Sequence, residues 1–252
     1  MVGMNTRQPL PLRVEDLGRL SYDDGLDAQK RRLAACQNDP DGPDTLLLVE
    51  HDPPVITLGR RADARHVLAA EDRLAAAGVQ LRRTRRGGDV TVHLPGQLVA
   101  YPIINLRRRD GDLHRYFRQL EAVVMATLAR FNLVGHRVPK RTGVWVHSRR
   151  DDPGAATPSE ERKIAAMGVA VSRWVTWHGL ALNVCCDLDL FGLIVPCGID
   201  DRGVTSLSAE LGRTVHVRQV KPILAEQFAE AFGCEVLATR AGEPTTASER
   251  PQ

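Results

Sequence analysis

The chain has 252 residues, 43% of them hydrophobic and 26% charged, which is typical of an ordinary globular protein. Its 34 basic and 31 acidic residues leave a formal net charge of only +3, which excludes a polycation that binds nucleic acid over its whole surface. No run is long and apolar enough to span a membrane, and no apolar signal core follows the N-terminus, so we expect a cytoplasmic protein. The five cysteines are an odd number without a secretion signal, which favours free thiols over disulfides.

Hydrophobic periodicity predicts three helices and eight short strands. Ser21 caps a first helix that reaches about residue 36, Asp112 begins a second that reaches about residue 131, and a third covers 220–232. Strands are expected at 46–49, 55–58, 90–93, 98–104, 144–147, 164–171, 174–177 and 180–184. Because the strands come in consecutive groups, we expect an α+β fold with a mixed, largely antiparallel sheet flanked by helices.

The domain organisation follows from where polar, unperiodic segments fall. Residues 1–9 and 240–252 are predicted to be flexible tails, and 10–239 to be a single catalytic domain without internal repeats. Residues 149–162, rich in charged and small residues with two prolines, predict a mobile loop between two strands. Such a loop directly before Lys163 is either a lid or an insertion without a role.

Two segments place reactive side chains where each has a plain alternative explanation. Lys163 leads into an apolar strand, so it is either a solvated strand end or a partly buried lysine that can act as a base. Cys197 lies between Pro196 and Gly198 on a shaped loop, as an inert small hydrophobe or as a reactive thiol. His178, Cys185, Cys186 and Cys197 lack the paired spacing of a zinc site, so no metal site is predicted.

Two further segments combine glycines with histidines. In 85–93, Arg-Arg-Gly-Gly-Asp-Val-Thr-Val-His, paired glycines let the backbone approach a ligand closely, although a tight turn uses the same residues. In 177–183, the small Gly179 and Ala181 leave room for an aliphatic chain or for a packed helix. The arginine runs at 82–86 and 107–109 indicate solvated faces or docking patches for an acidic or phosphate-bearing partner.

Taken in order, the segments resemble the octanoyltransferases of lipoate biosynthesis. The resemblance rests on Arg-Gly-Gly-x-Val-Thr-x-His, x-Pro-Gly-Gln, Lys-Ile-Ala-x-x-Gly, His-Gly-x-Ala-Leu-Asn and Pro-Cys-Gly-Ile, and covers about 46–232. It implies the fold of biotin and lipoate protein ligases. It further implies octanoyl transfer from octanoyl-acyl carrier protein to a lysine of lipoyl domains, either in 2-oxoacid dehydrogenase E2 subunits or in glycine cleavage H protein, without a cofactor.

The same resemblance implies roles for individual residues. Cys197 corresponds to the acyl-carrying cysteine and Lys163 to its partnering lysine. Leu94 stands where the family usually has a glycine, and Val92 replaces a common aromatic residue. The implied substrate-binding residues are Arg86, Gly87, Gly88, Asp89, Val90, Thr91, Val92, His93, Ala166, Met167, Gly168, Gly179, Leu180 and Ala181.

Two other functions use overlapping features. An ATP-dependent lipoate-protein ligase on the same scaffold activates a free acid and needs no cysteine, so the pairing of Lys163 with Cys197 favours the transferase. A non-catalytic nucleic-acid-binding module would act through the arginines at 82–86 and predicts strongly salt-dependent affinity. We expect neither nucleic acid nor a membrane as a partner.

Overall fold

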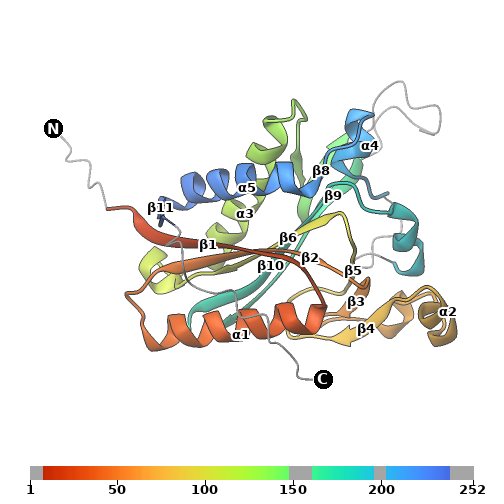
Figure 1. Ribbon diagram of the computed structural model, residues 1–252, viewed down its shortest axis with the longest axis horizontal. Coiled ribbons are helices and arrows are strands. Elements are labelled where there is room, and N and C mark those ends of the chain that lie inside the picture. The colour runs from red at the N-terminus through yellow and green to blue at the C-terminus, as the bar shows by residue number, and fades with distance from the viewer. Residues whose placement is uncertain (1–7, 148–160, 196–202, 239–252) are drawn as a thin grey trace, which may run out of the picture.

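A mixed sheet of eight strands forms the centre of the computed structural model, which describes residues 8–147, 161–195 and 203–238 (Figure 1). The strand order is β11-β1-β2-β6-β10-β9-β8-β7. The β1–β2 and β1–β11 pairs are parallel and the remaining pairs are antiparallel, which confirms the predicted α+β fold and its largely antiparallel sheet. The strands are β1 (Leu10–Leu20), β2 (Asp44–His51), β6 (Gln97–Ile103), β7 (His136–Val138), β8 (Arg141–His147), β9 (Glu161–Ser172), β10 (Val175–Asn183) and β11 (Cys234–Val236).

A second, smaller sheet lies against one end of the first (Figure 1). It has the order β4-β3-β5, with β3 (Val55–Leu58) parallel to β4 (Gln80–Arg83) and antiparallel to β5 (Val90–His93). Its own apolar core includes the short helix α2 (Glu71–Ala76) and the 3-10 helix Leu188–Leu193. The sequence predicted β3 and β5 with these bounds but not that they leave the main sheet.

Helices cover both faces of the large sheet because its central strands are apolar on both sides. Along β2, Leu46 and Leu48 face a large core under α3 (Leu113–Ala129) and α5 (Val217–Phe232), while Leu47 and Val49 face α1 (Tyr22–Asn38). Figure 1 shows α1 on one side of the sheet and α3 with α5 on the other. Shorter helical turns are α4 (Leu207–Leu211) and the 3-10 turns Ala64–His66 and Leu106–Arg109.

The predicted helix starts follow from their caps. The Ser21 hydroxyl accepts the Asp24 N–H at 3.1 Å, and the Asp112 carboxylate accepts the Arg115 N–H at 3.0 Å, so both predicted N-termini are confirmed. The third helix begins at Val217, three residues before the prediction. Within the described ranges, no helix combines the length and apolar character that a membrane span requires.

Several boundaries differ from the prediction. The eleven-residue β1 was missed, and the predicted strands 174–177 and 180–184 form one continuous strand, β10, which Trp174 precedes in a tight turn with a φ of 68°. The predicted tails at 1–9 and 240–252 fall almost wholly outside the described residues, as does most of the predicted loop 149–162. Glu161 and Arg162, at the end of that loop, are the first residues of β9.

Candidate active site

A pocket with an empty volume of about 410 Å³, counted out to its mouth, lies where the large sheet meets the small one. It gathers residues from three of the predicted segments, on β5, β9 and β10, together with α1 and β6. The lining residues are Tyr22, Arg86, Thr91, His93, Val99, Tyr101, Ala166, Met167, Gly168, His178, Gly179, Leu180 and Ala181.

The pocket explains the alternation within the predicted glycine-rich segment. Thr91 and His93 face the pocket, whereas Val90 and Val92 point into the core of the small sheet, because successive strand residues face opposite sides. Val92, which differs from the residue usual in the family, therefore lies in that core rather than in the pocket wall. Leu94 is also buried in this core, so the two sequence departures do not line the pocket.

The remaining predicted contacts of this segment shape the turn before β5. The carboxylate of Asp89 accepts the Asp63 N–H at 3.1 Å and binds the His66 ring. Gly87 donates its N–H to the Val169 carbonyl at 2.9 Å, which ties the turn to β9. Gly88 has a φ of +89°, a conformation that favours glycine. Gly87, Gly88 and Asp89 are thus placed beside the pocket but not in its lining.

Glycines on β9 and β10 let neighbouring backbone approach closely. Gly179 pairs with Gly168, and a Cβ at Gly179 would lie 2.1 Å from the Ala100 carbonyl oxygen of β6. A Cβ at Gly168 would lie 2.9 Å from the Gly87 carbonyl oxygen. Gly168 and Gly179 therefore allow β6 and the turn at Gly87 to pack closely against β9 and β10, and they also leave space in the pocket.

Arg86 brings a buried positive charge to the pocket wall. Its side chain is 7% exposed and donates to the hydroxyl and the carbonyl of Thr57 and to the Gly87 carbonyl. These bonds hold the guanidinium in place and satisfy its donors during burial. Arg86 therefore places a fixed cation at the pocket wall.

Four lining residues were not predicted as contacts: Tyr22, Val99, Tyr101 and His178. Tyr22 opens α1 and Val99 and Tyr101 lie on β6, so only the folded arrangement brings them to the pocket. His178 belongs to a segment that the sequence did single out, and its φ of +56° turns it within β10. In the sequence, the position of His178 directly before Gly179 was the signal that could have identified it as a pocket residue.

Three buried histidines in and beside the pocket are held neutral. Burial lowers the pKa of His93 to about 3, assisted by the neighbouring His51, and lowers that of His178 to about 3. Burial also lowers the pKa of His51 to about 4, and its Nε2 lies 2.7 Å from the Tyr101 hydroxyl. These imidazoles act near neutral pH as hydrogen-bonding groups without charge.

A chain of buried hydrogen bonds runs from the pocket to Lys163. The His93 Nδ1 lies 2.8 Å from the Gln97 Oε1, and the Gln97 side-chain amide donates to the Asn183 side-chain oxygen Oδ1 at 2.9 Å. Asn183 donates to the Thr205 carbonyl at 2.9 Å, and the Thr205 N–H donates to the Lys163 carbonyl at 3.0 Å. Residues from four of the predicted segments are thereby linked in one polar network.

Lys163 is the third residue of β9 and is buried, with 6% of its surface exposed. Its ammonium lies over the Trp145 ring, 4.7 Å from the centroid, in a cation–π contact. Its N–H donates at 2.9 Å to the carbonyl of Gly203, the first described residue after the segment that contains Cys197. Of the two readings of Lys163, the partly buried lysine is the one observed.

Cys197 itself lies outside the described residues. The other four cysteines are free, and burial raises the pKa of Cys36 to about 11 and of Cys186 to about 12. Burial also raises the pKa values of Cys185 and Cys234. All four are protonated, unreactive thiols at neutral pH. Within the described residues, His178, Cys185 and Cys186 do not form a cluster of possible metal ligands, whereas ligand atoms of His136, His147 and Glu161 lie within 4.8 Å of one another.

The arginine runs are less available for docking than the sequence suggested. Arg108 and Arg109 clamp the buried Asp44 carboxylate at 2.5 and 2.8 Å, and Arg109 also donates to the Phe232 carbonyl at 2.6 Å. Of this run only Arg107 is exposed, so 107–109 is chiefly a structural clamp. Around the small sheet, Arg82 pairs with Asp23, and Arg60, Arg61, Arg83 and Arg85 are among the exposed arginines.

Comparison with known proteins identifies the class to which this fold and pocket belong. Residues 21–229 match the family model described as lipoyl protein ligase A/B catalytic domain. The structure of a putative lipoate protein ligase from Thermoplasma acidophilum with bound lipoic acid superposes with a TM-score of 0.63 at 16% identity, over 90% of this chain and 88% of that one. The pocket therefore lies in a catalytic domain with the lipoate protein ligase fold.

Closer relatives narrow the class to one activity. An octanoyltransferase from Chloroflexus aurantiacus is 50% identical over 225 residues, which cover 89% of this chain and 95% of that protein. An octanoyltransferase from Myxococcus xanthus is 44% identical, and the match covers 89% of this chain and 60% of that longer protein. The chain belongs to the octanoyltransferase family, and the resemblance seen in the sequence is confirmed.

Proposed function

We propose that this octanoyltransferase carries its acyl group on the sulfur of Cys197, with Lys163 as the proton-handling partner. The Cys197 thiolate attacks the thioester carbonyl of octanoyl-acyl carrier protein, the carbon–sulfur bond to the carrier breaks, and the departing carrier sulfur takes a proton from the Lys163 ammonium. A lipoyl-domain lysine amine then attacks the new thioester, an amide forms, and the Cys197 sulfur leaves. The observation that carries the proposal is the burial of Lys163. Its backbone N–H bonds to the carbonyl of Gly203, the first described residue after the segment that contains Cys197.

The buried ammonium supplies the first requirement, a thiolate. A free cysteine has a pKa near ~8.5, so it is mostly protonated at neutral pH. A cation about 4 Å away at an effective dielectric of ~20 stabilises the thiolate by up to ~4 kcal/mol, roughly three pKa units before opposing desolvation.

The same pair meets the second requirement, a neutral acceptor amine. An unperturbed lysine with a pKa near ~10.4 is neutral in about one molecule in two thousand at pH 7. Once Lys163 has given its proton to the departing carrier sulfur, its neutral amine can accept the proton of the incoming lysine as a general base. One lysine thus serves both half-reactions without a cofactor.

The pocket supports an aliphatic acyl chain. Ala166, Gly168, Gly179 and Ala181 pair across β9 and β10 and give a narrow apolar wall, and His93 is a neutral neighbour. Val90 and Val92 support this wall from behind, through the core of the small sheet. We assign the predicted substrate contacts accordingly, with Gly87, Gly88 and Asp89 shaping the turn.

The proposed donor and acceptors are proteins. Exposed arginines at 60, 61, 83 and 85 on the small sheet fit an acidic, phosphopantetheine-bearing acyl carrier protein. Lipoyl domains of 2-oxoacid dehydrogenase E2 subunits and the glycine cleavage H protein are the proposed acceptors. Transfer from a thioester to an amide is downhill, so no nucleotide is required, in contrast to the ligase alternative.

Intact-protein mass spectrometry after incubation with octanoyl-acyl carrier protein tests the mechanism. We expect a mass gain of one octanoyl group, mapped to Cys197 and discharged when a lipoyl domain is added. Cys197→Ala should abolish the adduct, whereas the matched control Cys185→Ala, at a half-buried and protonated thiol, should keep it. An adduct that persists in Cys197→Ala, or transfer that requires ATP, would contradict the proposal.

A further inference from the structure

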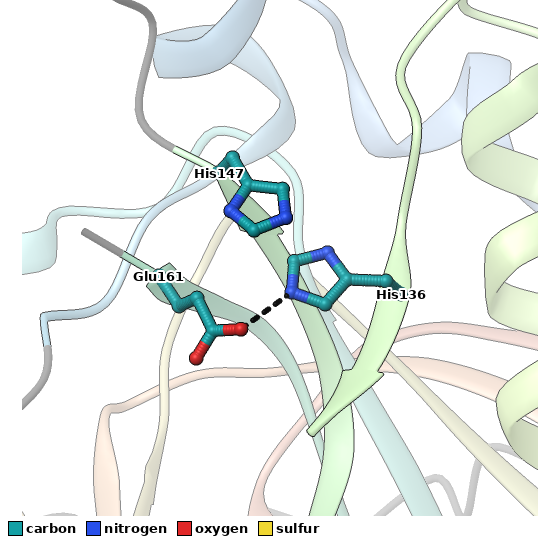
Figure 2. A group of neighbouring side chains, drawn as sticks. All are labelled: His136, His147 and Glu161. Carbon is teal, nitrogen blue, oxygen red and sulfur yellow. Dashed lines mark hydrogen bonds and ion pairs between the residues drawn. The ribbon is translucent and has the colours of Figure 1, made fainter. Parts of the chain in front are cut away.

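Two imidazoles and a carboxylate meet where β7, β8 and β9 lie side by side (Figure 2). One ligand atom from each of His136, His147 and Glu161 lies within 4.8 Å of the other two. The His136 Nε2 and the Glu161 Oε1 are 3.0 Å apart, and the two histidine rings are stacked with centroids 4.1 Å apart. We propose that these three residues bind a divalent transition-metal ion, of which Zn²⁺ is the best match.

The ligand chemistry favours this class of ion. Two histidines and one carboxylate are a common protein ligand set of Zn²⁺, with a fourth position for water. Imidazole nitrogens prefer zinc and its neighbours in the first transition row over Mg²⁺ or Ca²⁺, which prefer oxygen ligands. No thiol is needed, so the site is chemically distinct from the cysteine segments.

The geometry needs only a small adjustment. Zinc bonds of about 2.0–2.1 Å in a tetrahedron separate the ligand atoms by roughly 3.3 Å. The His136 and Glu161 atoms already meet this spacing at 3.0 Å. His147 is exposed, so its ring can turn toward an ion without moving buried atoms.

The sheet register creates the site and explains why the sequence did not reveal it. His147 lies opposite Glu161 across β8 and β9, and His136 comes from β7, the edge strand on the other side of β8. His136 and Glu161 are 25 residues apart in the chain, so no short ligand spacing marks the set. Only the pairing of the three strands brings them together.

The two arginines next to the ligands in the chain are already paired with other carboxylates. Arg137 follows His136 and pairs with Glu121 at 2.8 Å, while Arg162 follows Glu161 and pairs with Glu210 at 3.0 Å. Adjacent strand residues point to opposite sides, which directs these guanidinium groups away from the three ligands. Their charge is therefore no strong barrier to a bound cation.

A bound ion would tie the edge of the sheet. β7 has only three residues, and His147 and Glu161 are the described residues that flank 148–160. A metal joining the three strands stabilises the folded state, to which alone the complete ligand set belongs. We therefore expect Zn²⁺ to raise the thermal unfolding midpoint.

Isothermal titration of the metal-free full chain with ZnCl₂ tests the site. We expect one ion per chain, with affinity at least tenfold weaker in His147→Ala and in Glu161→Gln. His114→Ala, which removes an exposed histidine on α3, is the matched control and should bind as the parent does. Unfolding midpoints should rise with Zn²⁺ in the parent and control, but not in His147→Ala.

Cobalt absorption separates this site from binding by thiols. Co²⁺ held by nitrogen and oxygen shows no thiolate-to-cobalt charge-transfer band, so none is expected in the parent protein. Equal Zn²⁺ affinity in the parent and His147→Ala, a thiolate band that disappears in Cys197→Ala, or no binding at all would each overturn the proposal. Since His147 is exposed, its loss does not threaten folding.

Discussion

Replacing Gly179 by alanine should destabilise the fold through a clash between β10 and β6. The new Cβ would lie 2.1 Å from the Ala100 carbonyl oxygen and 2.6 Å from the Pro102 Cδ. Both atoms belong to a central strand, the first to its backbone and the second to a rigid ring, so neither can swing aside. The two strands must separate instead, which weakens the ladder that pairs Leu180 with Ala100.

The magnitude follows from two opposing effects. Overpacking in a well-packed interior costs about 1–3 kcal/mol, and a clash with fixed backbone belongs near ~3 kcal/mol. Alanine also restricts the unfolded chain relative to glycine, which returns about 0.4–1 kcal/mol. The net loss of unfolding free energy should therefore be about 2 kcal/mol.

Urea unfolding of Gly179→Ala beside Gly192→Ala measures this difference. A Cβ at Gly192 meets no atom within 4 Å, so this control should be neutral or slightly stabilised. The clash variant should also lose octanoyl transfer, because Leu180 and Ala181 move with β10 out of the pocket wall. Equal midpoints for the two variants would refute the steric reasoning.

Three further outcomes are expected. Asp44→Ala should cost about 3–5 kcal/mol in urea unfolding, because it leaves the largely buried Arg108 and Arg109 without their carboxylate; a loss below ~1 kcal/mol would contradict this clamp. Lowering the pH from 7 to 5 should cost about 2 kcal/mol for each of the three buried pocket histidines, measured by unfolding at both values. Their folded pKa values lie below the unfolded value near ~6.5, so stability falls as the pH drops below that value, and an equal unfolding free energy at both values would rule this out. Arg83→Glu with Arg85→Glu should raise the KM for octanoyl-acyl carrier protein several-fold with little change in kcat, and an unchanged KM would exclude docking there.

Local signals in the sequence predicted the helices and the central strands well. Ser21 and Asp112 are helix caps that act over three residues, so their effect is readable without the fold. β1 was missed because its apolar/polar alternation covers only 12–15 before Asp16 and Gly18 interrupt it, and because the strand is specified by its pairing with β2 and β11. Strand pairing is a long-range property that tertiary contacts decide.

The same distinction applies to the site. The motif around His93 was recognisable, but the opposite directions of Thr91 and Val92 required the position of β5 between the pocket and a second core. Tyr22 and Tyr101 come from α1 and β6 and carry no local signal. The arginines at 107–109 looked like a surface patch because the sequence does not show that Asp44, more than sixty residues away, binds two of them.

The polar chain from His93 to Lys163 connects substrate binding with the proposed chemistry. Gln97 and Asn183 are both nearly fully buried, and each has its partner fixed by a strand of the central sheet. A buried amide that loses one partner leaves unsatisfied groups that cost about 1–3 kcal/mol each, so the links hold together as a unit. The same network holds the Thr205 backbone against the backbone of Lys163. This arrangement positions the lysine through the fold itself, which explains why the residues between the sequence motifs matter as much as the motifs.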